Sequence, residues 1–202
     1  MATATNDRAM TLHNQINDLR KELYETFREM AQMNVPDCTM LRSDGSSVKL
    51  SELFADRDEL MLIHNMGQSC VYCTLWADGF NGVTKHLANR VPFALITPDD
   101  PTTATEFARS RGWHMPIVCY AESGLAEQLG FRNEEGGYMP GFSTFRKNPD
   151  NSITRTGMSF FGPGDDFCAI WHMFALLPDG VNDWTPKYTY TGSCGPSCGC
   201  HH

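Results

Sequence analysis

Residues 60–82 read LMLIHNMGQSCVYCTLWADGFNG, and they carry a strand signal, a pair of cysteines and a helix signal in that order. Residues 60–64 form a short apolar run followed by Gly67, which is typical of a buried strand. A helix is expected to begin near Cys70, because four apolar residues then recur on one helical face: Trp76, Phe80, Val83 and Leu87. The sequence therefore predicts that the cysteine pair lies where a buried strand passes into a helix.

The cysteine pair has the spacing Cys70-Val71-Tyr72-Cys73. At the first turn of a helix, the first sulfur meets unpaired backbone N–H groups and the positive end of the helix dipole, and both stabilise a thiolate. The second sulfur lies about one turn further along and can reach the first. We expect Cys70 to attack the disulfide of a protein or small-molecule substrate and Cys73 to resolve the mixed disulfide. This exchange requires no cofactor.

Two other interpretations of the pair stay open at this point. The cysteines could be half of a structural zinc site, or they could be two ordinary buried thiols. A closed zinc site needs two more ligands, which His64 or the C-terminal tail could supply.

Local signals predict further elements on both sides of the pair. On the N-terminal side these are a helix over about 11–33, a hairpin around 44–45 and a helical turn at 51–54. On the C-terminal side they are a strand at 93–96, a helix over 101–111 capped by Asp100 and ended by Gly112, a strand at 117–120, a helical turn within 122–129, and strands at 142–146 and 153–160. A last helix is expected to start at 165–166, with one face formed by Phe167, Ile170, Trp171 and Phe174.

The order of these elements indicates the fold. Alternating strands and helices predict parallel strands with right-handed crossovers, and a terminal antiparallel hairpin added to such a start is the thioredoxin arrangement. We therefore expect an α/β, thioredoxin-like fold, with a central mixed sheet flanked by helices. Three parts are expected: a helical extension over 1–35, the thioredoxin-like domain over 36–186 and an irregular Cys/Gly-rich tail over 187–202.

Residues 67–82 resemble the C-x-x-C-x-x-W-A-D-x-F-x-G signature of a bacterial thioredoxin-like family, catalogued as a domain of unknown function and described as predicted dithiol-disulfide oxidoreductases. Residues 111–113 with Pro116, and residues 142–145, resemble two further family segments, so the resemblance covers about residues 36–177. It implies a thioredoxin fold with Cys70 as nucleophile and Cys73 as resolving thiol. This chain differs in having Val71-Tyr72 between the cysteines, where many members have Pro-Ser, and in its Cys-rich tail.

Four more residues are candidate neighbours of the dithiol. Trp76 is either a core residue or a ring beside the sulfurs, and Asp78 is either a solvated helix residue or a group that accepts a proton or fixes a loop. Thioredoxin folds usually place a cis-proline against the dithiol, and Pro140 is the first candidate for it, followed by Pro116. His64 and His114 could also lie nearby, although a single histidine is more often structural.

The C-terminal tail is the second cluster of thiols. Cys194, Cys198, Cys200 and His201 lie within a few residues of one another among glycines, a composition that suits Zn(II) or Cu(I). The alternatives are free thiols, an artificial tag that accounts for the final two histidines, or a tail thiol that acts as a redox relay to Cys70.

Charge and composition limit the class of partner. The chain of 202 residues has a net charge of −8, which disfavours nucleic acid as a partner. No apolar run approaches the ~20 residues that cross a bilayer, so no membrane partner is expected, and the N-terminus lacks a signal-peptide core, so a cytoplasmic protein is expected. The amphipathic N-terminal helix is compatible with a homodimer.

Three functions compete with disulfide exchange. Peroxiredoxins are thiol peroxidases that carry Thr three residues before the reactive cysteine, where this chain has Gly67. The tail suggests a zinc or copper carrier on the same fold. A non-catalytic interaction module would instead have a dithiol that resists oxidation and alkylation.

Overall fold

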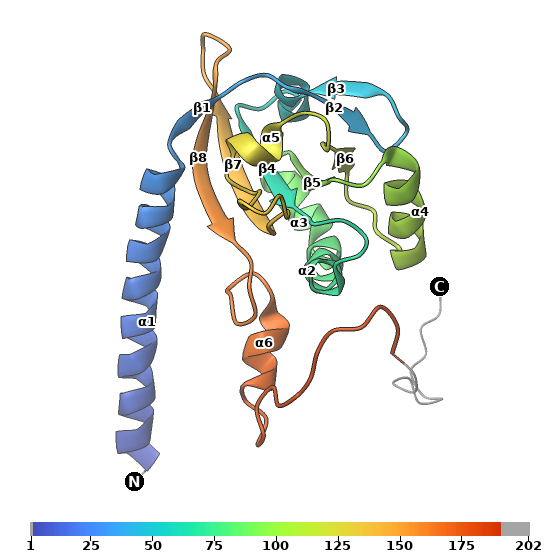
Figure 1. Cartoon of the computed structure of the whole chain (residues 1–202). Helices are drawn as coiled ribbons and strands as arrows, with labels where there is room; N and C mark the ends of the chain where they lie inside the picture. The colour runs from blue at the N-terminus through green and yellow to red at the C-terminus, as the bar shows by residue number, and fades with distance from the viewer. Residues whose placement is uncertain (1, 191–202) are drawn as a thin grey trace.

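The structure is a computed structural model, and it describes residues 2–190. One eight-stranded sheet forms its centre, with the strand order β1-β8-β7-β4-β5-β6-β2-β3 (Figure 1). The strands are β1 (Met33–Val35), β2 (Thr39–Arg42), β3 (Ser47–Lys49), β4 (Glu59–His64), β5 (Phe93–Thr97), β6 (Ile117–Cys119), β7 (Gly141–Lys147) and β8 (Ile153–Phe160). The helices are α1 (Ala2–Ala31), the 3-10 helix η1 (Leu50–Phe54), α2 (Val71–Gly82), α3 (Thr84–Arg90), α4 (Pro101–Arg111), α5 (Leu125–Gln128) and α6 (Ala169–Phe174).

The sheet is mixed, as predicted. Strands β4, β5 and β6 are parallel neighbours, and the other strand pairs are antiparallel. Parallel neighbours need a crossover connection, which the chain provides through α2 and α3 between β4 and β5 and through α4 between β5 and β6. The terminal hairpin β7–β8 adds to β4 on the other side, which completes the thioredoxin-like arrangement.

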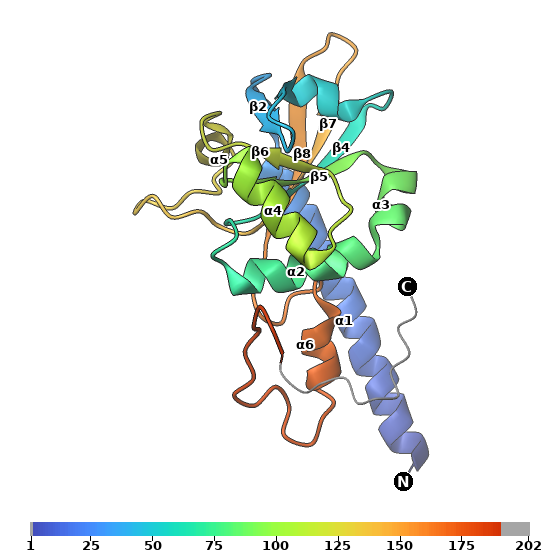
Figure 2. The same cartoon turned by 90° about the vertical axis from the view of Figure 1, so that its right-hand side faces the viewer.

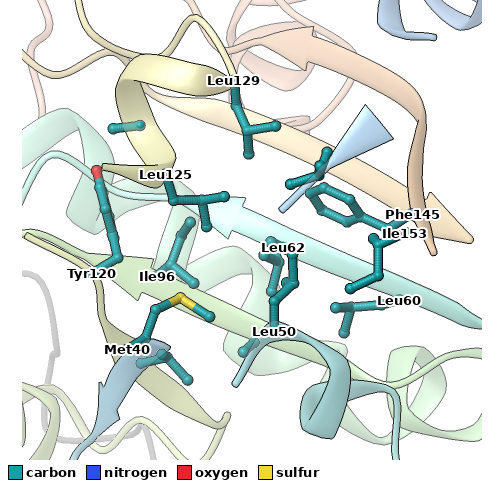
Figure 3. Packing of buried hydrophobic residues seen from close by; sticks show 14 of the residues in the cluster. Met40, Leu50, Leu60, Leu62, Ile96, Tyr120, Leu125, Leu129, Phe145 and Ile153 are labelled. Atoms are coloured by element: carbon teal, nitrogen blue, oxygen red, sulfur yellow. The ribbon is translucent and has the colours of Figure 1, made fainter. Parts of the chain in front are cut away.

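Side chains that alternate along the strands fill two separate cores. Leu60 and Leu62 of β4 belong to the first core, which Figure 3 shows, and Ile63 belongs to the second. The first core takes further residues from η1, α5, β7 and β8, whereas the second is rich in aromatic rings and contains the buried face of α2. Burial on both faces of the central strands explains why these strands read as continuous apolar runs in the sequence.

Helix α4 forms where its capping signals place it. Asp100 accepts hydrogen bonds from the backbone N–H groups of Thr102 and Thr103, Pro101 occupies the first turn, and Gly112 ends the helix with φ of 65°. The Asp100 side chain satisfies N–H groups that the first turn of a helix leaves without partners, and Gly112 adopts the left-handed conformation that ends a helix. Both ends of α4 are therefore determined by local residues, which is why they could be predicted from the sequence.

The continuous helical face expected from Trp76 to Leu87 is wrong at Val83. The helix breaks there into α2 and α3, and the side chain of Val83 is 42% exposed. The hydroxyl of Thr84 bonds to the carbonyl oxygens of Phe80 and Asn81 at the break. Gly82 lies directly before this point, and its low helix propensity favours an interruption.

The last helix also begins later than expected, at Ala169 rather than at 165–166. Asp165 instead uses its carboxylate to accept hydrogen bonds from the N–H groups of Phe167 and Cys168. An aspartate with local donors of this kind stabilises a turn in place of the first helical residues.

Helix α1 is longer than the predicted 11–33 segment at its start and ends before Met33, which instead begins the edge strand β1. It extends well beyond the sheet, as Figures 1 and 2 both show. Contacts with β8 and an ion pair between Arg20 and Asp166 (2.6 Å) attach it to the rest of the chain. Its apolar residues Leu12, Ile16, Leu19 and Leu23 are exposed. None of the helices within residues 2–190 combines the length and apolar character needed to span a bilayer.

Candidate active site

The loop that leads from β4 to Cys70 is held by two acceptor side chains. Asn65 accepts a hydrogen bond from the N–H of Gly67 (2.7 Å), and Asp99 accepts one from the N–H of Gln68 (2.8 Å). Gly67 has φ of +98°, and a Cβ added there would lie 2.8 Å from Oδ1 of Asp99. Glycine is therefore required for both backbone conformation and space, and this geometry sets where α2 begins.

Cys70 occupies the N-cap position of α2. Its Sγ accepts a hydrogen bond from the N–H of Cys73 over 3.1 Å, and its carbonyl oxygen accepts one from the N–H of Thr74. Cys70 is partly exposed, whereas Cys73 is 3% exposed, and both are free thiols in this structure. The predicted helix start at the pair is thus confirmed, and the sulfur itself acts as the cap.

The two sulfurs have strongly unequal pKa values. A side-chain hydrogen bond from Cys73, together with the backbone N–H groups of Cys73 and Tyr72, lowers the pKa of Cys70 from 9.0 to about 7, although its partial burial opposes this effect. The same hydrogen bond to Cys70, burial and the nearby Cys70 charge raise the pKa of Cys73 far above its ordinary value. The arrangement thus stabilises a thiolate on the exposed sulfur and keeps the proton on the buried one.

Trp76 is a buried residue whose indole has a specific partner. Its Nε1 donates a hydrogen bond to Oδ2 of Asp165 over 2.9 Å, and its ring centroid lies 6.3 Å from that of Tyr72 and 6.1 Å from that of Trp171. Tyr72 stands between the cysteines in the sequence and is stacked against Trp171. Aromatic rings therefore line the second core directly behind the dithiol, and Trp76 fits its core interpretation.

Asp78 fixes a loop, one of the two functional roles considered for it. Its carboxylate forms an ion pair with Arg111 and accepts a hydrogen bond from Nε1 of Trp113 over 2.8 Å. These contacts join α2 to the end of α4 and to the residues that follow it.

Neither of the two candidates for a cis-proline, Pro140 and Pro116, is one, because every peptide bond of residues 2–190 is trans. The carbonyl oxygens of both prolines accept backbone hydrogen bonds near the sheet. The oxygen of Pro140 accepts a hydrogen bond from Phe161 N–H, and that of Pro116 accepts one from Leu95 N–H, each over 2.9 Å. The trans form is the intrinsically preferred one.

The two candidate histidines differ in their environments. His64 is 1% exposed, contacts Ser143 through Nε2 (2.9 Å) and is stacked on Phe131 with 3.6 Å between the ring centroids. Burial and then the nearby Arg155 lower the pKa of His64 to about 3, so the neutral imidazole is favoured in the folded protein. His114 is exposed, and its backbone N–H donates to Asn81.

Tyr188 is a neighbour of the dithiol loop that the sequence did not reveal. Its hydroxyl donates a hydrogen bond to the carbonyl oxygen of Gln68 over 2.9 Å, and Arg111 donates one to the Tyr188 carbonyl oxygen over 2.6 Å. The Tyr188 ring meets Phe107 edge-on, with 6.2 Å between the centroids. The segment carries no regular structure over 187–190, as predicted, so neither helical nor strand periodicity could reveal the contact.

The proposed metal ligands Cys194, Cys198, Cys200 and His201 lie outside the described residues. Within residues 2–190, the structure brings together no group of three or more His, Cys, Asp or Glu side chains that could hold a metal ion.

Comparisons with known proteins identify the family and the fold of the chain. The profile of the family described as "Bacterial protein of unknown function (DUF899)" matches residues 4–193. No curated protein matches significantly. Among solved structures, peroxidoxin BcpB from Mycobacterium tuberculosis is 24% identical with a TM-score of 0.52, and the match covers 64% of this chain and 84% of that one. Reduced Prx3 from Vibrio vulnificus, solved in complex with H2O2, is 14% identical with a TM-score of 0.51, and the match covers 67% and 86%.

At these identities the two structures show a common fold and nothing finer. The family match covers nearly the whole chain, including the cysteine pair and the Trp76–Asp78 segment. The chain therefore belongs to the bacterial family DUF899, and its fold is thioredoxin-like.

Proposed function

We propose that the protein is a thiol-disulfide oxidoreductase in which Cys70 is the nucleophile and Cys73 the resolving thiol. The observation that carries the proposal is the N-cap contact, in which the N–H of Cys73 points at the partly exposed Cys70 sulfur over 3.1 Å. A sulfur in this position gains stabilisation from α2 as an anion while staying accessible to a substrate.

The exchange follows from the unequal pKa values. The Cys70 thiolate attacks one sulfur of a substrate disulfide, forms a mixed disulfide and releases the other substrate sulfur as a thiolate. Cys70 then no longer carries a charge or accepts the hydrogen bond from Cys73, so both of the causes of the raised Cys73 pKa that come from Cys70 disappear. Cys73 can then lose its proton and attack the Cys70 sulfur. The second substrate thiolate leaves, and two electrons have passed from the dithiol to the substrate.

A peroxide is the second candidate substrate, because the two similar solved structures are named as a peroxidoxin and a Prx3 bound to H2O2. The Cys70 thiolate would attack the O–O bond to give a sulfenic acid and, after protonation, water. Cys73 would then condense with the sulfenic acid, releasing a second water and forming the same disulfide. Gly67 in place of the Thr expected three residues before a peroxiredoxin cysteine speaks against this substrate.

Single-turnover oxidation of the fully reduced chain tests both substrates. We expect oxidised glutathione to give a transient glutathione adduct at Cys70 and then a Cys70–Cys73 disulfide, both identified by peptide mass spectrometry. In the peroxide case, a Cys73→Ser variant treated with H2O2 would accumulate a dimedone-reactive sulfenic acid at Cys70, faster than free cysteine does.

Two variants make the test specific. Cys70→Ser should abolish both reactions, whereas Cys38→Ser is the matched control, since Cys38 is also partly exposed but burial raises its pKa. If Cys70→Ser reduces oxidised glutathione at the wild-type rate, the proposed function is wrong.

A further inference from the structure

We propose that an exposed apolar stripe on α1 binds the same stripe of a second copy of this chain, so that the two α1 helices form an antiparallel coiled coil. The stripe consists of Leu12, Ile16, Leu19, Leu23 and Met30, whose side chains are 44–64% exposed. None of these residues belongs to the dithiol site, so the inference does not depend on the proposed function.

The stripe is separate from the face by which α1 contacts its own chain. That inner face lies toward β8 and Asp166, and its residues are buried or half-buried: Asn17, Arg20, Tyr24, Phe27 and Ala31. With 3.6 residues per turn, the stripe is centred about a quarter of a turn around the helix from the inner face. Helix α1 therefore has a second apolar face that residues 2–190 leave exposed, on a helix that projects beyond the sheet (Figures 1 and 2).

The spacing of the stripe is that of a coiled coil. From Leu12 to Met30 its positions alternate between four and three residues apart, with Thr26 filling the one position that is not apolar, and Ala9 extends the pattern by one step toward the N-terminus. This repeat of 3.5 residues continues over three heptads, whereas a helix that covers a globular core usually has a broader apolar face. The occupant that fits the stripe is thus another long helix with the same repeat.

The charges beside the stripe favour an antiparallel pair of copies. Arg8 and Glu29 lie on the side of the stripe that faces away from β8, and neither forms an ion pair within residues 2–190. In an antiparallel pair this side meets the same side of the second copy, so Arg8 of each copy faces Glu29 of the other. In a parallel pair, Arg8 would face His13 instead. Glu22 would face Phe27, so neither charge would gain an opposite partner.

The register that joins these charges also matches the apolar side chains. It places Leu12 opposite Leu23 of the second copy and Ile16 opposite Leu19, so that each large side chain in the middle of the stripe packs on another. Because the sheet lies at the C-terminal end of α1 (Figure 1), the two folded domains are then at opposite ends of the helix pair. The domains therefore leave the stripe free for the partner helix.

A lipid surface is the other kind of occupant that an amphipathic helix can have. Helices that lie on membranes are rich in Lys and Arg on the polar face, which attract anionic headgroups. The charges of α1 are nearly balanced, with five acidic and four basic residues: Asp7, Asp18, Glu22, Glu25, Glu29, Arg8, Arg20, Lys21 and Arg28. This balance favours a protein partner over a membrane.

Sedimentation of the full-length chain, with its thiols kept reduced, measures the affinity of the pair. We expect a dimer, and the double change Ile16→Glu/Leu19→Glu should weaken it roughly a hundredfold or more, since it places charges in the middle of the apolar contact. Asn14→Glu is the matched control. Asn14 is exposed on the opposite side of α1 from the stripe, so this variant should dimerise like the wild type.

Charge reversal tests the orientation without disturbing the apolar side chains. Arg8→Glu alone and Glu29→Arg alone should each weaken the dimer about tenfold, because each places like charges opposite one another at two symmetric positions. The combined variant Arg8→Glu/Glu29→Arg should recover the wild-type affinity. A parallel pair would show no such recovery.

Cysteine cross-linking gives a second, independent measurement of orientation. A mixture of Leu12→Cys and Leu23→Cys chains should form a disulfide between positions 12 and 23, identified as a linked peptide by non-reducing mass spectrometry. Leu12→Cys alone should give no link between two copies of position 12, because an antiparallel pair holds them far apart. A link between the two copies of position 12 would overturn the antiparallel arrangement.

Three further results would overturn the inference. A wild-type chain that is monomeric at every concentration tested would leave the stripe without its proposed partner. A dimer that Ile16→Glu/Leu19→Glu does not weaken would have its interface elsewhere. A monomer that binds phosphatidylglycerol vesicles, and loses this binding in Ile16→Glu/Leu19→Glu, would assign the stripe to a lipid surface.

Discussion

The indole Nε1 of Trp113 donates a hydrogen bond to Oδ1 of Asp78 over 2.8 Å. Arg111 forms an ion pair with the same carboxylate, so one aspartate on α2 binds both outer residues of the 111–113 segment. Residues 67–82 and 111–113 are two of the segments that resemble the family signature. These two segments, which are far apart in the sequence, are joined in the structure by the Asp78 carboxylate. It attaches the end of α4 to α2, the helix that begins after Cys70.

Replacement of Asp78 by Ala should lower the free energy of unfolding by about 2 kcal/mol. It removes the contacts with Arg111 and Trp113, and a hydrogen bond to a charged acceptor contributes roughly 1.5–3 kcal/mol. Because the Asp78 carboxylate is partly exposed, solvent screening makes the two contacts together worth less than twice that value. The measurement is the free energy of unfolding in urea. Asp56→Ala is the control: Asp56 is exposed and lies 3.8 Å from Arg57, so its loss should cost less than about 0.5 kcal/mol. Equal losses in the two variants would contradict the structural role of Asp78.

Replacement of Gly67 by Ala should destabilise the protein and disturb the dithiol. The added Cβ would lie 2.8 Å from Asp99 Oδ1, at a backbone φ of +98°. Gly45→Ala is the matched control, because Gly45 also has a positive φ, of 84°, but nothing lies within 4 Å of the added Cβ. Strain from φ alone costs about 1 kcal/mol, so we expect a greater loss at Gly67, and only Gly67→Ala should alter the alkylation rate of Cys70. Identical unfolding free energies in the two variants would show that the contact with Asp99 is relieved without cost.

The parts of the fold that the sequence could predict are those whose cause is local. Asp100 and Gly112 bracket α4 with contacts inside its first and last turns, and the apolar run at 60–64 marks a strand covered on both faces. The helix start at Cys70 belongs to this group as well, since the capping contact spans three residues.

The parts that the sequence could not predict depend on partners far along the chain. Asp78 meets Trp113 and Trp76 meets Asp165, and neither pairing leaves a periodicity in the sequence. The contact of Tyr188 with the dithiol loop joins residues 120 positions apart. Spacing could show that Trp76 and Asp78 lie on the helix after the cysteines, but which neighbour each one binds follows only from the packed structure.

The stability of the protein should fall as the pH is lowered, in part through a single buried histidine. Burial lowers the pKa of His64 to about 3, below its ordinary value of 6.5. The neutral form is therefore favoured in the folded state, so this contribution is fully present above pH 6.5 and is lost as the pH falls toward 3. A single proton taken up on unfolding gives a slope of about 1.4 kcal/mol per pH unit. The free energy of unfolding should be measured against pH between pH 6 and pH 4.5 for the wild type and for His64→Gln. The slope should be shallower in the variant by nearly 1.4 kcal/mol per pH unit. Equal slopes in the two proteins would be inconsistent with a buried neutral imidazole.

Two effects that lower the pKa of Cys70, the side-chain hydrogen bond from Cys73 and the backbone N–H groups at the start of α2, can be measured separately. The side-chain bond from Cys73 is the largest cause of the lowered Cys70 pKa, and the backbone N–H groups of Cys73 and Tyr72 contribute less. Cys73→Ala removes the side-chain donor and keeps both N–H groups, so the Cys70 pKa should rise from about 7 toward 9. Cys73→Ser keeps a hydroxyl donor in the same place and should leave the pKa nearer to 7.

The pH dependence of alkylation at the Cys70 peptide, followed by mass spectrometry so that other thiols do not interfere, measures both values. Half-maximal rate should occur about one pH unit or more higher in the alanine variant than in the serine variant, with Cys38→Ala as the control that matches the wild type. In the wild type, the pH of half-maximal alkylation should be about 7. If both Cys73 variants have the same midpoint, the helix N-terminus alone stabilises the thiolate. Cys73 would then act in resolution of the mixed disulfide and not in activation of the nucleophile.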